Sequence, residues 1–333
     1  MKVTTKVKKV LITTVPFGEK NRAPLDMLES NNIDYVINPF NKKLTESELE
    51  GLISDFDVVI AGTEQITSKV MDAASNLKLI SRVGIGLDSV DLLAAENKGI
   101  TVSYTPDAPA PAVAELTIGM MLTLLRSVHV SNSQMHSGDW YRFFGRRLSE
   151  VVIGIIGVGR IGQGVLKHLK GFGNPKILVN DVSTKVGVSN KFDCEWVSKE
   201  AIYKHADIIS LHLPLTSETK DVIKKKHLLS MKSDAIIINT SRGGIINEKD
   251  LYDVMQSGHL SGAAIDVFDE EPYDGLLKEI ERCLLTAHMG SMSVDCRTRM
   301  EIEATEEAVR FLTGKKLEGK VPEDEYEVQR KGL

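Results

Sequence analysis

A glycine-rich motif is the first feature of the sequence with a definite chemistry. Gly157, Gly159 and Gly162 enclose Arg160 and Ile161 in a G-x-G-x-x-G pattern, directly after an apolar run. The first glycine permits a tight turn from strand to helix, the second lets backbone approach a pyrophosphate, and the third lets helix and strand pack closely. The helix start then offers amide donors and a positive dipole end to phosphates. The motif predicts a dinucleotide site; a glycine-rich turn in some other α/β protein is the alternative.

A carboxylate at Asp181 refines this prediction. It follows the next apolar run, about 20 residues beyond the glycines, where an acidic side chain accepts hydrogen bonds from the ribose hydroxyls of a dinucleotide. The same negative charge would repel a 2′-phosphate. We therefore expect the cofactor to be NAD(H) in preference to NADP(H).

Three further side chains, Arg242, Glu271 and His288, each follow an apolar run. Imidazole exchanges protons near neutral pH, which suits acid–base catalysis, and a neighbouring carboxylate would fix the ring and favour its charged form. A guanidinium presents a planar fork that binds a carboxylate through two hydrogen bonds. Together the three could bind a carboxylic acid and move a proton. Taken singly, they could be a surface ion pair, a turn carboxylate before Pro272 and a strand-end cap.

Two series of alternating strands and helices must position these residues. The first series has strand-like runs at 10–15, 35–38, 58–62, 77–83 and 100–104, with helix-like spacing at 45–53 and 68–74. The second has strand-like runs at 151–156, 177–180, 207–213, 235–240, 262–267 and 284–287, with helices after the glycine motif through Leu169 and at 297–312. Their continuous apolar character indicates parallel sheets buried on both faces.

A proline-rich segment at 105–111 separates the two series and predicts a linker. The helix expected over 112–130 has little polar face, so it needs cover on several sides. We expect this helix and the segment 140–148 to form the interface of a homodimer, with burial of the helix inside one subunit as the alternative.

The length of 333 residues favours two domains over one. The predicted fold class is α/β: two Rossmann-like, doubly wound parallel-sheet domains with an interdomain cleft. We expect 1–105 and 293–333 to form a discontinuous substrate domain and 106–292 to form the NAD-binding domain. The active site would lie in the cleft between them.

Bulk composition excludes several classes of protein. The 41 basic and 46 acidic residues give a net charge of -5, which argues against a general binder of nucleic acid or of an anionic membrane. No apolar run is long enough to span a bilayer, and the amino-terminal run is too short for a signal peptide. Three widely spaced cysteines, Cys194, Cys283 and Cys296, indicate neither a disulfide framework nor a metal site. A cytoplasmic protein without a bound metal is expected.

Motifs along most of the chain, from about residue 50 to about residue 312, add a family resemblance. They are SRVGIGLDSVD at 81–91, AEL at 114–116, GDW at 138–140, the glycine motif, LHLPLT at 211–216, NTSRGG at 239–244, DVFDEEP at 266–272 and TAHMG at 286–290. In this order the motifs resemble those of the D-isomer-specific 2-hydroxyacid dehydrogenases, most closely the phosphoglycerate dehydrogenase-like branch. The resemblance implies hydride transfer between NAD(H) and a small acid, with His288 as the acid–base group, Glu271 as its partner and Arg242 on the substrate carboxylate and keto oxygen.

The resemblance also implies further contacts. Val83, Gly84 and Gly86 would bind the substrate carboxylate through backbone N–H groups, in a glycine-rich loop that could also be a turn without a ligand. The remaining cofactor residues would be His212, Pro214 and Thr216 near the adenine, Thr240 and Ser241 near the nicotinamide ribose, Asp266 near the carboxamide and Gly290 beside the nicotinamide.

Several positions depart from the family pattern. Ala287 replaces the usual proline before the histidine, and Ser291 replaces a second glycine. The loop 62–67 lacks the arginine that phosphoglycerate-specific members place near phosphate, and Glu64 is unfavourable for a doubly charged group. Phosphoglycerate dehydrogenase therefore competes with a glyoxylate/hydroxypyruvate reductase and with a phosphite-type dehydrogenase. A non-enzymatic NAD-sensing protein, like the dehydrogenase-like corepressors, is the remaining alternative.

Overall fold

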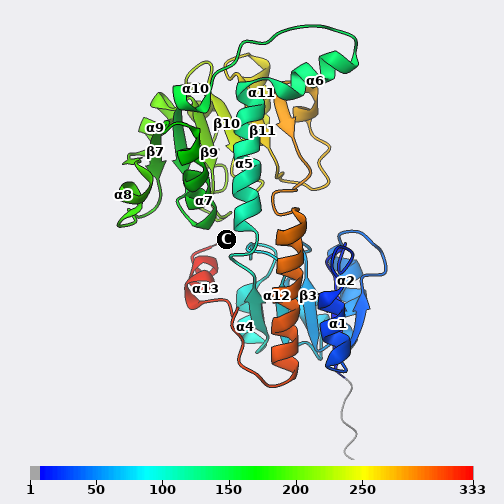
Figure 1. Cartoon of the computed structure of the whole chain (residues 1–333). Helices are drawn as coiled ribbons and strands as arrows, with labels where there is room; N and C mark the ends of the chain where they lie inside the picture. Colours follow the sequence, from blue (N-terminus) through cyan, green and yellow to red (C-terminus); the bar gives the residue numbers. More distant parts are fainter. Residues whose placement is uncertain (1–7, 333) are drawn as a thin grey trace, which may run out of the picture. The chain divides into compact units, whose positions relative to one another are not determined.

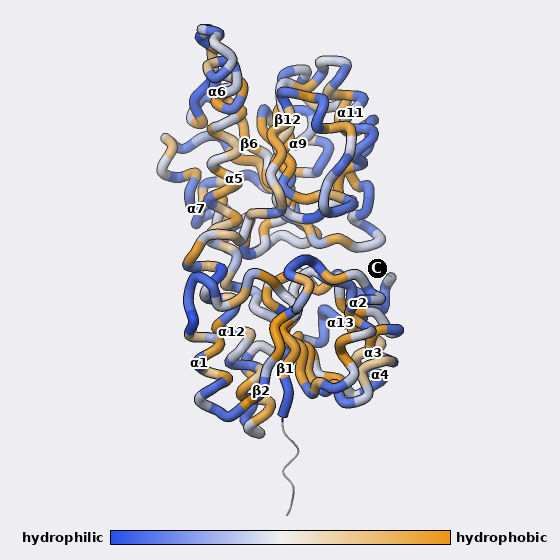
Figure 2. Tube along the Cα trace, turned by 90° about the vertical axis from the view of Figure 1, so that its right-hand side faces the viewer, coloured by the Kyte–Doolittle hydropathy of each residue, from blue (hydrophilic) through white to orange (hydrophobic). Residues whose placement is uncertain are grey.

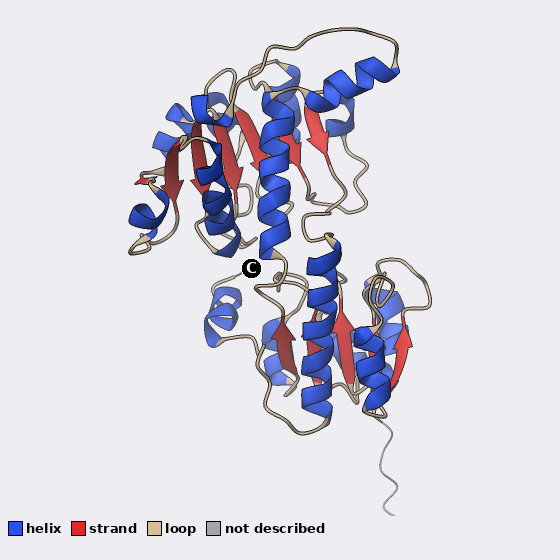
Figure 3. Cartoon of the chain, in the orientation of Figure 1, coloured by secondary structure: helices blue, strands red, loops and turns tan. Residues whose placement is uncertain are grey.

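A computed structural model describes residues 8–332, which form two compact units. Unit 1 consists of the described residues up to Pro109 together with those from Ser293 onward, and unit 2 consists of Ala110–Met292. Each unit is a parallel sheet with helices on both faces (Figures 1 and 3). Unit 2 is thus inserted into the sequence of unit 1.

Unit 1 contains a five-stranded sheet in the order β2-β1-β3-β4-β5. Its strands are β1 (Lys9–Ile12), β2 (Asp34–Ile37), β3 (Val58–Ala61), β4 (Leu79–Arg82) and β5 (Thr101–Tyr104). Its helices are α1 (Ala23–Ser30), α2 (Glu46–Leu52), α3 (Ser68–Ala73), α4 (Leu92–Asn97), α12 (Val294–Leu312) and α13 (Glu323–Arg330), with a short 3-10 turn η1 (Ile53–Asp55).

Unit 2 contains a seven-stranded sheet in the order β12-β11-β10-β9-β6-β7-β8. Its strands are β6 (Val152–Ile156), β7 (Lys176–Asn180), β8 (Glu195–Trp196), β9 (Ile208–Leu211), β10 (Ile236–Asn239), β11 (Gly262–Ile265) and β12 (Cys283–Leu285). Its helices are α5 (Ala110–Leu125), α6 (Val128–His136), α7 (Arg160–Leu169), α8 (Val188–Phe192), α9 (Lys199–His205), α10 (Lys225–Ser230) and α11 (Glu248–Gln256), with 3-10 turns η2 (Leu148–Glu150), η3 (Lys170–Phe172) and η4 (Leu276–Glu279).

Helix α12 covers one face of the sheet of unit 1. Met300 and Ala304 pack in one apolar cluster with Val10 and Ile12, while Leu11, between them in β1, belongs to the cluster on the opposite face. This alternation is the period of two expected of a strand. The hydroxyl of Ser81 in β4 also donates to the Ala304 carbonyl at 2.8 Å, fully buried. Helix α12 is therefore part of the core of unit 1. Apolar residues follow the strands of both units in Figure 2.

The strands predicted from apolar runs are confirmed, each with its observed bounds inside or within a residue or two of the expected range. The single helix expected over 112–130 is wrong. Ser127 adopts a left-handed backbone conformation with φ of 49°, which ends α5 and starts α6 in a new direction. Neither glycine nor proline marks this break in the sequence. Strand β8 and helix α13 were not predicted, because two residues and a highly charged segment carry little apolar pattern.

Helix α5 buries part of its apolar surface within unit 2. Val113, Thr117, Met121 and Leu125 are among its buried residues, and α5 packs against α7, β10 and β11 of unit 2. Burial within one subunit therefore accounts for 8 of the 16 residues of this helix, and its predicted part in a dimer interface stays a prediction. Within residues 8–332 no single helix has the length and apolar character to cross a bilayer; α5 and α6, bent by 64° at their junction, do so only when counted as one.

Candidate functional site

The predicted residues of unit 2 gather at one edge of its sheet. Because all of its strands are parallel, their carboxyl ends meet at the same edge. Gly157, Asp181 and His212 follow β6, β7 and β9, whereas Arg242, Glu271 and His288 follow the adjacent strands β10, β11 and β12. The strand order reverses between β6 and β9, which is where open α/β sheets bind ligands.

The three glycines of the motif differ in what a side chain would meet. A Cβ on Gly157, whose φ is 95°, would lie 2.2 Å from the carbonyl oxygen of His212. A Cβ on Gly162 would lie 2.1 Å from the Gly157 carbonyl oxygen, so it would separate α7 from the turn. A Cβ on Gly159 would have no described atom within 4 Å. The turn and the helix packing require the outer glycines, and the middle one leaves room for another molecule.

These features fit a dinucleotide. Helix α7 begins at Arg160 and points its amide donors at the space beside Gly159. The His212 ring lies beside the same turn; its Nε2 pairs with Ser210 Oγ at 3.0 Å, while its buried Nδ1 has no hydrogen-bond partner among the described residues. Burial lowers the pKa of His212 to about 4, so the ring is neutral at pH 7. The His212 Nδ1 atom that has no partner among the described residues and the free space beside Gly159 are features expected of a site for a planar, phosphorylated ligand.

Asp181 is held rigidly at the end of β7. Its Oδ2 accepts from Val158 N–H at 2.8 Å and from Lys185 Nζ at 2.9 Å, and its Oδ1 accepts from Val182 N–H at 2.7 Å. Burial alone would raise the pKa of Asp181, but the hydrogen bond from Lys185 and those from the two amides outweigh it, so the net pKa is lowered. The carboxylate is therefore ionised, and it is paired with the Lys185 ammonium, a contact that the sequence did not predict.

His288 and Glu271 form a close pair. The Nδ1 atom of His288 lies 3.0 Å from Oε1 and 2.9 Å from Oε2 of Glu271. Because an ionised carboxylate only accepts, Nδ1 carries the proton of this contact and Nε2 is left for another partner. Oε1 of Glu271 also accepts from Phe268 N–H at 3.2 Å, which anchors the carboxylate to its own loop. The pairing inferred from residue types is therefore present in the geometry.

The loop that carries His288 is fixed by Asp266. Its Oδ1 accepts from Thr286 Oγ1 at 2.5 Å and from Met289 N–H, and its Oδ2 accepts from Gly290 N–H, both at 2.9 Å. His288 itself has φ of 47°, a costly conformation for this residue type, which surrounding contacts must maintain. Burial raises the pKa of Asp266. In a loop with Ala287 in place of proline, these bonds hold the backbone, and no motif had indicated Thr286 in this role.

Arg242 projects from a turn that Asn239 organises. The Asn239 Nδ2 donates to the Arg242 carbonyl at 2.8 Å, and its Oδ1 accepts from the Ser241 amide and hydroxyl at 3.1 and 2.7 Å. The guanidinium of Arg242 donates to the Ser241 carbonyl at 2.7 Å. A Cβ on Gly243 would lie 2.0 Å from the Phe268 carbonyl, so this turn touches the loop that leads to Glu271. Arg242 and the His288–Glu271 pair therefore belong to neighbouring, interlocked loops.

Negative charge surrounds Glu271. Burial raises the pKa of Glu248, and the charges of Asp269, Glu270 and Glu271 add to that effect against a hydrogen bond from Asp269 N–H.

The other predicted cofactor residues lie in the same loops. Ser241 and Thr240 are buried, and the Thr240 hydroxyl lies 2.9 Å from that of Thr117 in α5, so its side chain faces the core of the unit. Gly290 is buried against Asp266 and Val113. Pro214 and Thr216 belong to a turn in which Thr219 Oγ1 donates to the Pro214 carbonyl at 2.6 Å.

The corresponding edge of unit 1 alters one prediction. Val83 N–H donates to the Ala61 carbonyl at 2.9 Å, and Gly84 N–H donates to Thr105 Oγ1 at 2.8 Å. Both expected carboxylate donors are therefore already engaged. Within the described chain, the N–H groups of the next two residues, Ile85 and Gly86, donate to no internal acceptor. Gly86 was among the predicted donors, and Ile85 was not. The spacing of glycines could not reveal that Val83 and Gly84 are engaged, because this depends on the register of β4 against β3.

Two charged groups flank that loop of unit 1. The Arg82 guanidinium is buried and donates to the Val83 carbonyl at 2.7 Å; a Cβ on Gly84 would lie 3.3 Å from it. After the neighbouring strand β3, Glu64 is 2% exposed and accepts hydrogen bonds from Thr13 Oγ1 and from Gly62 N–H, the latter at 3.0 Å. A positive group thus lies against this loop, and a buried carboxylate follows the neighbouring strand.

The fold and the site of unit 2 define an α/β domain with a glycine turn that fits a dinucleotide and with a hydrogen-bonded histidine–glutamate pair on a loop next to that of an arginine. Comparison with known proteins identifies the family. The model of the NAD-binding domain of D-isomer specific 2-hydroxyacid dehydrogenases matches residues 118–290. The chain belongs to the D-isomer specific 2-hydroxyacid dehydrogenase family, whose members are NAD-dependent oxidoreductases.

Individual relatives differ in name and length. A D-3-phosphoglycerate dehydrogenase of Methanocaldococcus jannaschii is 38% identical over 284 residues, which are 84% of this chain but only 54% of that protein. A hydroxypyruvate reductase of Thermotoga maritima is 35% identical over 82% of this chain and 90% of the relative. The crystal structure of the TT0316 protein from Thermus thermophilus has a TM-score of 0.86 and 32% identity, covering 94% of this chain and 100% of that one. The chain thus spans about half of the first relative and most of the second.

Proposed function

We propose that this chain interconverts a small D-2-hydroxy acid and its 2-keto acid with NAD(H). The observation that carries the proposal is the His288–Glu271 pair, with Nδ1 within 3.0 Å of both carboxylate oxygens, on a loop next to that of Arg242. Reduction of a keto group needs a proton for the developing alkoxide and a cation for the carboxylate. Because the dehydrogenase-like corepressors keep the same residues, turnover of a 2-keto acid is the measurement that separates an enzyme from an NAD-sensing protein.

Each residue then has a specific task. Bound NADH supplies the hydride. Arg242 binds the carboxylate through its fork and polarises the keto oxygen. His288 donates the proton from Nε2 to that oxygen during reduction and removes it during oxidation, while Glu271 holds the ring by Nδ1 and stabilises its positive charge. Asp266 keeps the His288 loop in place through Thr286, Met289 and Gly290.

For the substrate carboxylate, we also propose the N–H group of Gly86, as the sequence predicts, together with that of Ile85, in place of those of Val83 and Gly84. Support comes from the hydrogen bonds that already engage the latter two and from the buried Arg82 guanidinium against the loop, whose positive charge attracts an anion. Val83 and Gly84 would then shape the loop through their contacts with Ala61 and Thr105.

The charged side chains of unit 1 favour a substrate that carries no phosphate group. Glu64 places a buried carboxylate after β3, the strand next to β4, and the loop of Ile85 and Gly86 follows β4. At the same edge, Arg297 bonds Glu301 at 2.7 Å and the Thr14 hydroxyl at 2.9 Å, so its charge is already neutralised. A doubly charged phosphate would meet repulsion there. Glyoxylate/hydroxypyruvate reduction is accordingly favoured over phosphoglycerate dehydrogenation and over a phosphite-type reaction.

A keto-acid panel tests this proposal. With NADH, we expect glyoxylate or hydroxypyruvate to give a higher kcat/KM than 3-phosphohydroxypyruvate, measured by the absorbance of the reduced nicotinamide. Glu64→Gln should raise activity on the phosphorylated acid relative to hydroxypyruvate, because it removes a negative charge while keeping the shape. Faster turnover of 3-phosphohydroxypyruvate by the unmodified protein would reverse the choice of substrate. NADH binding without turnover of any 2-keto acid, and without oxidation of phosphite, would support the sensing alternative.

We also propose that the protein is a cytoplasmic homodimer. Trp140, Tyr141 and Phe144 are 80%, 64% and 104% exposed, on a loop that extends with α6 from the end of unit 2 (Figure 1). Large exposed aromatic side chains favour burial against a partner. Light scattering should give the mass of a dimer, and Trp140→Asp with Phe144→Asp should give a folded monomer; a monomeric unmodified protein would contradict this. A reducing compartment agrees with three free cysteines.

A further inference from the structure

Lys185 occupies the acceptors that a dinucleotide ribose would use. Its Nζ lies 2.9 Å from Asp181 Oδ2 and donates to the Val158 carbonyl, within the glycine turn, at 2.8 Å. The two residues are four apart, but they lie in the loop between β7 and α8, so the contact is not a consequence of helical spacing. The ammonium is therefore pinned between the ribose-binding acid and the phosphate-binding turn.

Counting acceptors shows that this arrangement must change when a cofactor binds. A carboxylate offers about four lone-pair sites, and Asp181 already accepts from Val158 N–H, Val182 N–H and Lys185. One site remains, whereas a ribose diol brings two donors. The two backbone amides are fixed in the turn and the loop. Lys185 is therefore the donor that would lose its hydrogen bond to Asp181 when a ribose binds.

Lys185 can leave without disturbing the core. Its side chain is 37% exposed, compared with 13% for that of Asp181, and the neighbouring Val182 and Val186 are 97% and 102% exposed. Once displaced, the ammonium stays within a side chain's length of the ribose edge. An aspartate alone would reject a 2′-phosphate by repulsion, but here a mobile cation is available to form charge-assisted hydrogen bonds with it.

We propose that the Asp181–Lys185 pair lets this chain accept NADP(H) as well as NAD(H), with Lys185 moving from the aspartate to the 2′-phosphate. The inference rests on the proposed dinucleotide function. It replaces the expected exclusion of NADP(H) with binding of both cofactors. It also gives Lys185 opposite effects on the two cofactors. It competes with the ribose diol of NADH for Asp181, and it stabilises the extra phosphate of NADPH.

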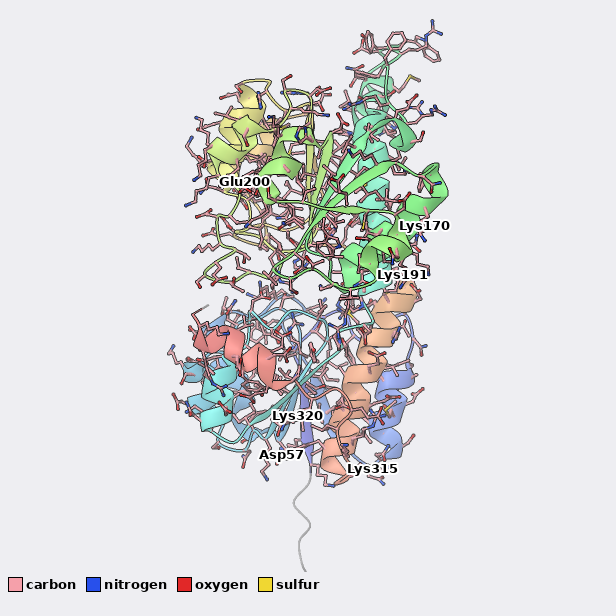
Figure 4. All side chains as sticks on the ribbon, turned by 90° about the vertical axis from the view of Figure 1, so that its left-hand side faces the viewer. Asp57, Lys170, Lys191, Glu200, Lys315 and Lys320 are labelled. Carbon is pink, nitrogen blue, oxygen red and sulfur yellow. The ribbon has the colours of Figure 1, made fainter. Side chains whose placement is uncertain are left out.

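Binding measurements on the full chain test this directly, independently of turnover. Calorimetric titration of the unmodified protein should detect NADH and NADPH, as well as the fragments 5′-AMP and 2′,5′-ADP, which differ by the 2′-phosphate. Lys185→Met should weaken NADPH and 2′,5′-ADP by roughly tenfold, since a hydrogen bond to a charged group is lost, and should leave NADH and 5′-AMP equal or tighter. Lys191→Met is the matched control, because it removes the same charge from a lysine that lies over the Phe192 ring in α8 (Figure 4).

The possible results distinguish a failure of the proposed role of Lys185 from a failure of the proposed dehydrogenase function. If the unmodified protein binds NADH and 5′-AMP but neither NADPH nor 2′,5′-ADP, the role of Lys185 is overturned while the dehydrogenase proposal stands. Equal losses for all four ligands in Lys185→Met, or the same selective loss in Lys191→Met, also overturn it. If no adenine ligand binds the unmodified protein, both proposals fail together.

Discussion

Replacing His288 with asparagine is expected to lower kcat/KM for keto-acid reduction by roughly a thousandfold, within the range attributed to general acid–base catalysis. Asparagine suits this position because His288 has a left-handed backbone, with φ of 47°, which asparagine tolerates better than most residues. Its side-chain amide can still donate to Glu271, but it supplies no proton at the position of Nε2. Steady-state kinetics with NADH and the best acid of the panel would measure the loss.

Cofactor binding and thermal stability are the controls for His288→Asn. Both should match the unmodified protein, because Asp266 holds the loop through Thr286, Met289 and Gly290 and not through the imidazole. Retention of more than about a tenth of the activity would remove His288 from the reaction, since a positioned acid contributes at least about a hundredfold.

Removal of the Arg242 side chain should have a comparably large effect. Arg242→Ala is expected to lower kcat/KM by roughly a thousandfold, as when an enzyme loses a hydrogen-bond donor to developing negative charge. The turn should survive, because Asn239 holds the carbonyl of residue 242 and the amide of Ser241, and neither contact uses the guanidinium. Kinetics over a range of keto-acid concentrations would show a higher KM together with a lower kcat.

Arg242→Lys is the informative companion variant. Lysine keeps the positive charge but not the planar fork, so it should recover only part of the loss. If lysine restored full activity, a simple charge would suffice and the two-point contact with the carboxylate would be wrong. NADH affinity unchanged in both variants would assign the loss to the substrate side of the reaction.

Apolar patterning predicted the strands because a parallel sheet covered on both faces needs continuous apolar runs. It failed where structure depends on a single backbone conformation. Ser127 breaks the helix at α5–α6 with φ of 49°, although serine is no regular helix breaker, and the isolated Glu195–Trp196 strand is defined by pairing with β7. Such features arise from three-dimensional context, which no local window of the sequence contains.

For the site, residue types at strand ends predicted the pairing of His288 with Glu271 but not the groups that support it. Asn239 and Thr286 act through hydrogen bonds to loops, and Lys185 acts through an ion pair across an irregular turn. The engagement of Val83 and Gly84 follows from the register of β4 on β3 and from Thr105, 21 residues further along the chain. These contacts need coordinates because the partners are distant in sequence or joined by loops of no fixed geometry.

The split sequence of unit 1 has a consequence for how the protein is made. All five strands of its sheet are complete by Tyr104, yet Met300 and Ala304, which cover Val10 and Ile12, are translated only after the whole of unit 2. At about 5–20 residues per second, tens of seconds pass before α12 can cover its part of that apolar face. Until then, only residues made early, such as Leu25 and Leu28 of α1, can cover it. The nascent chain therefore depends most on chaperone protection during this interval, and damage to α12 would expose the earliest-made part of the molecule.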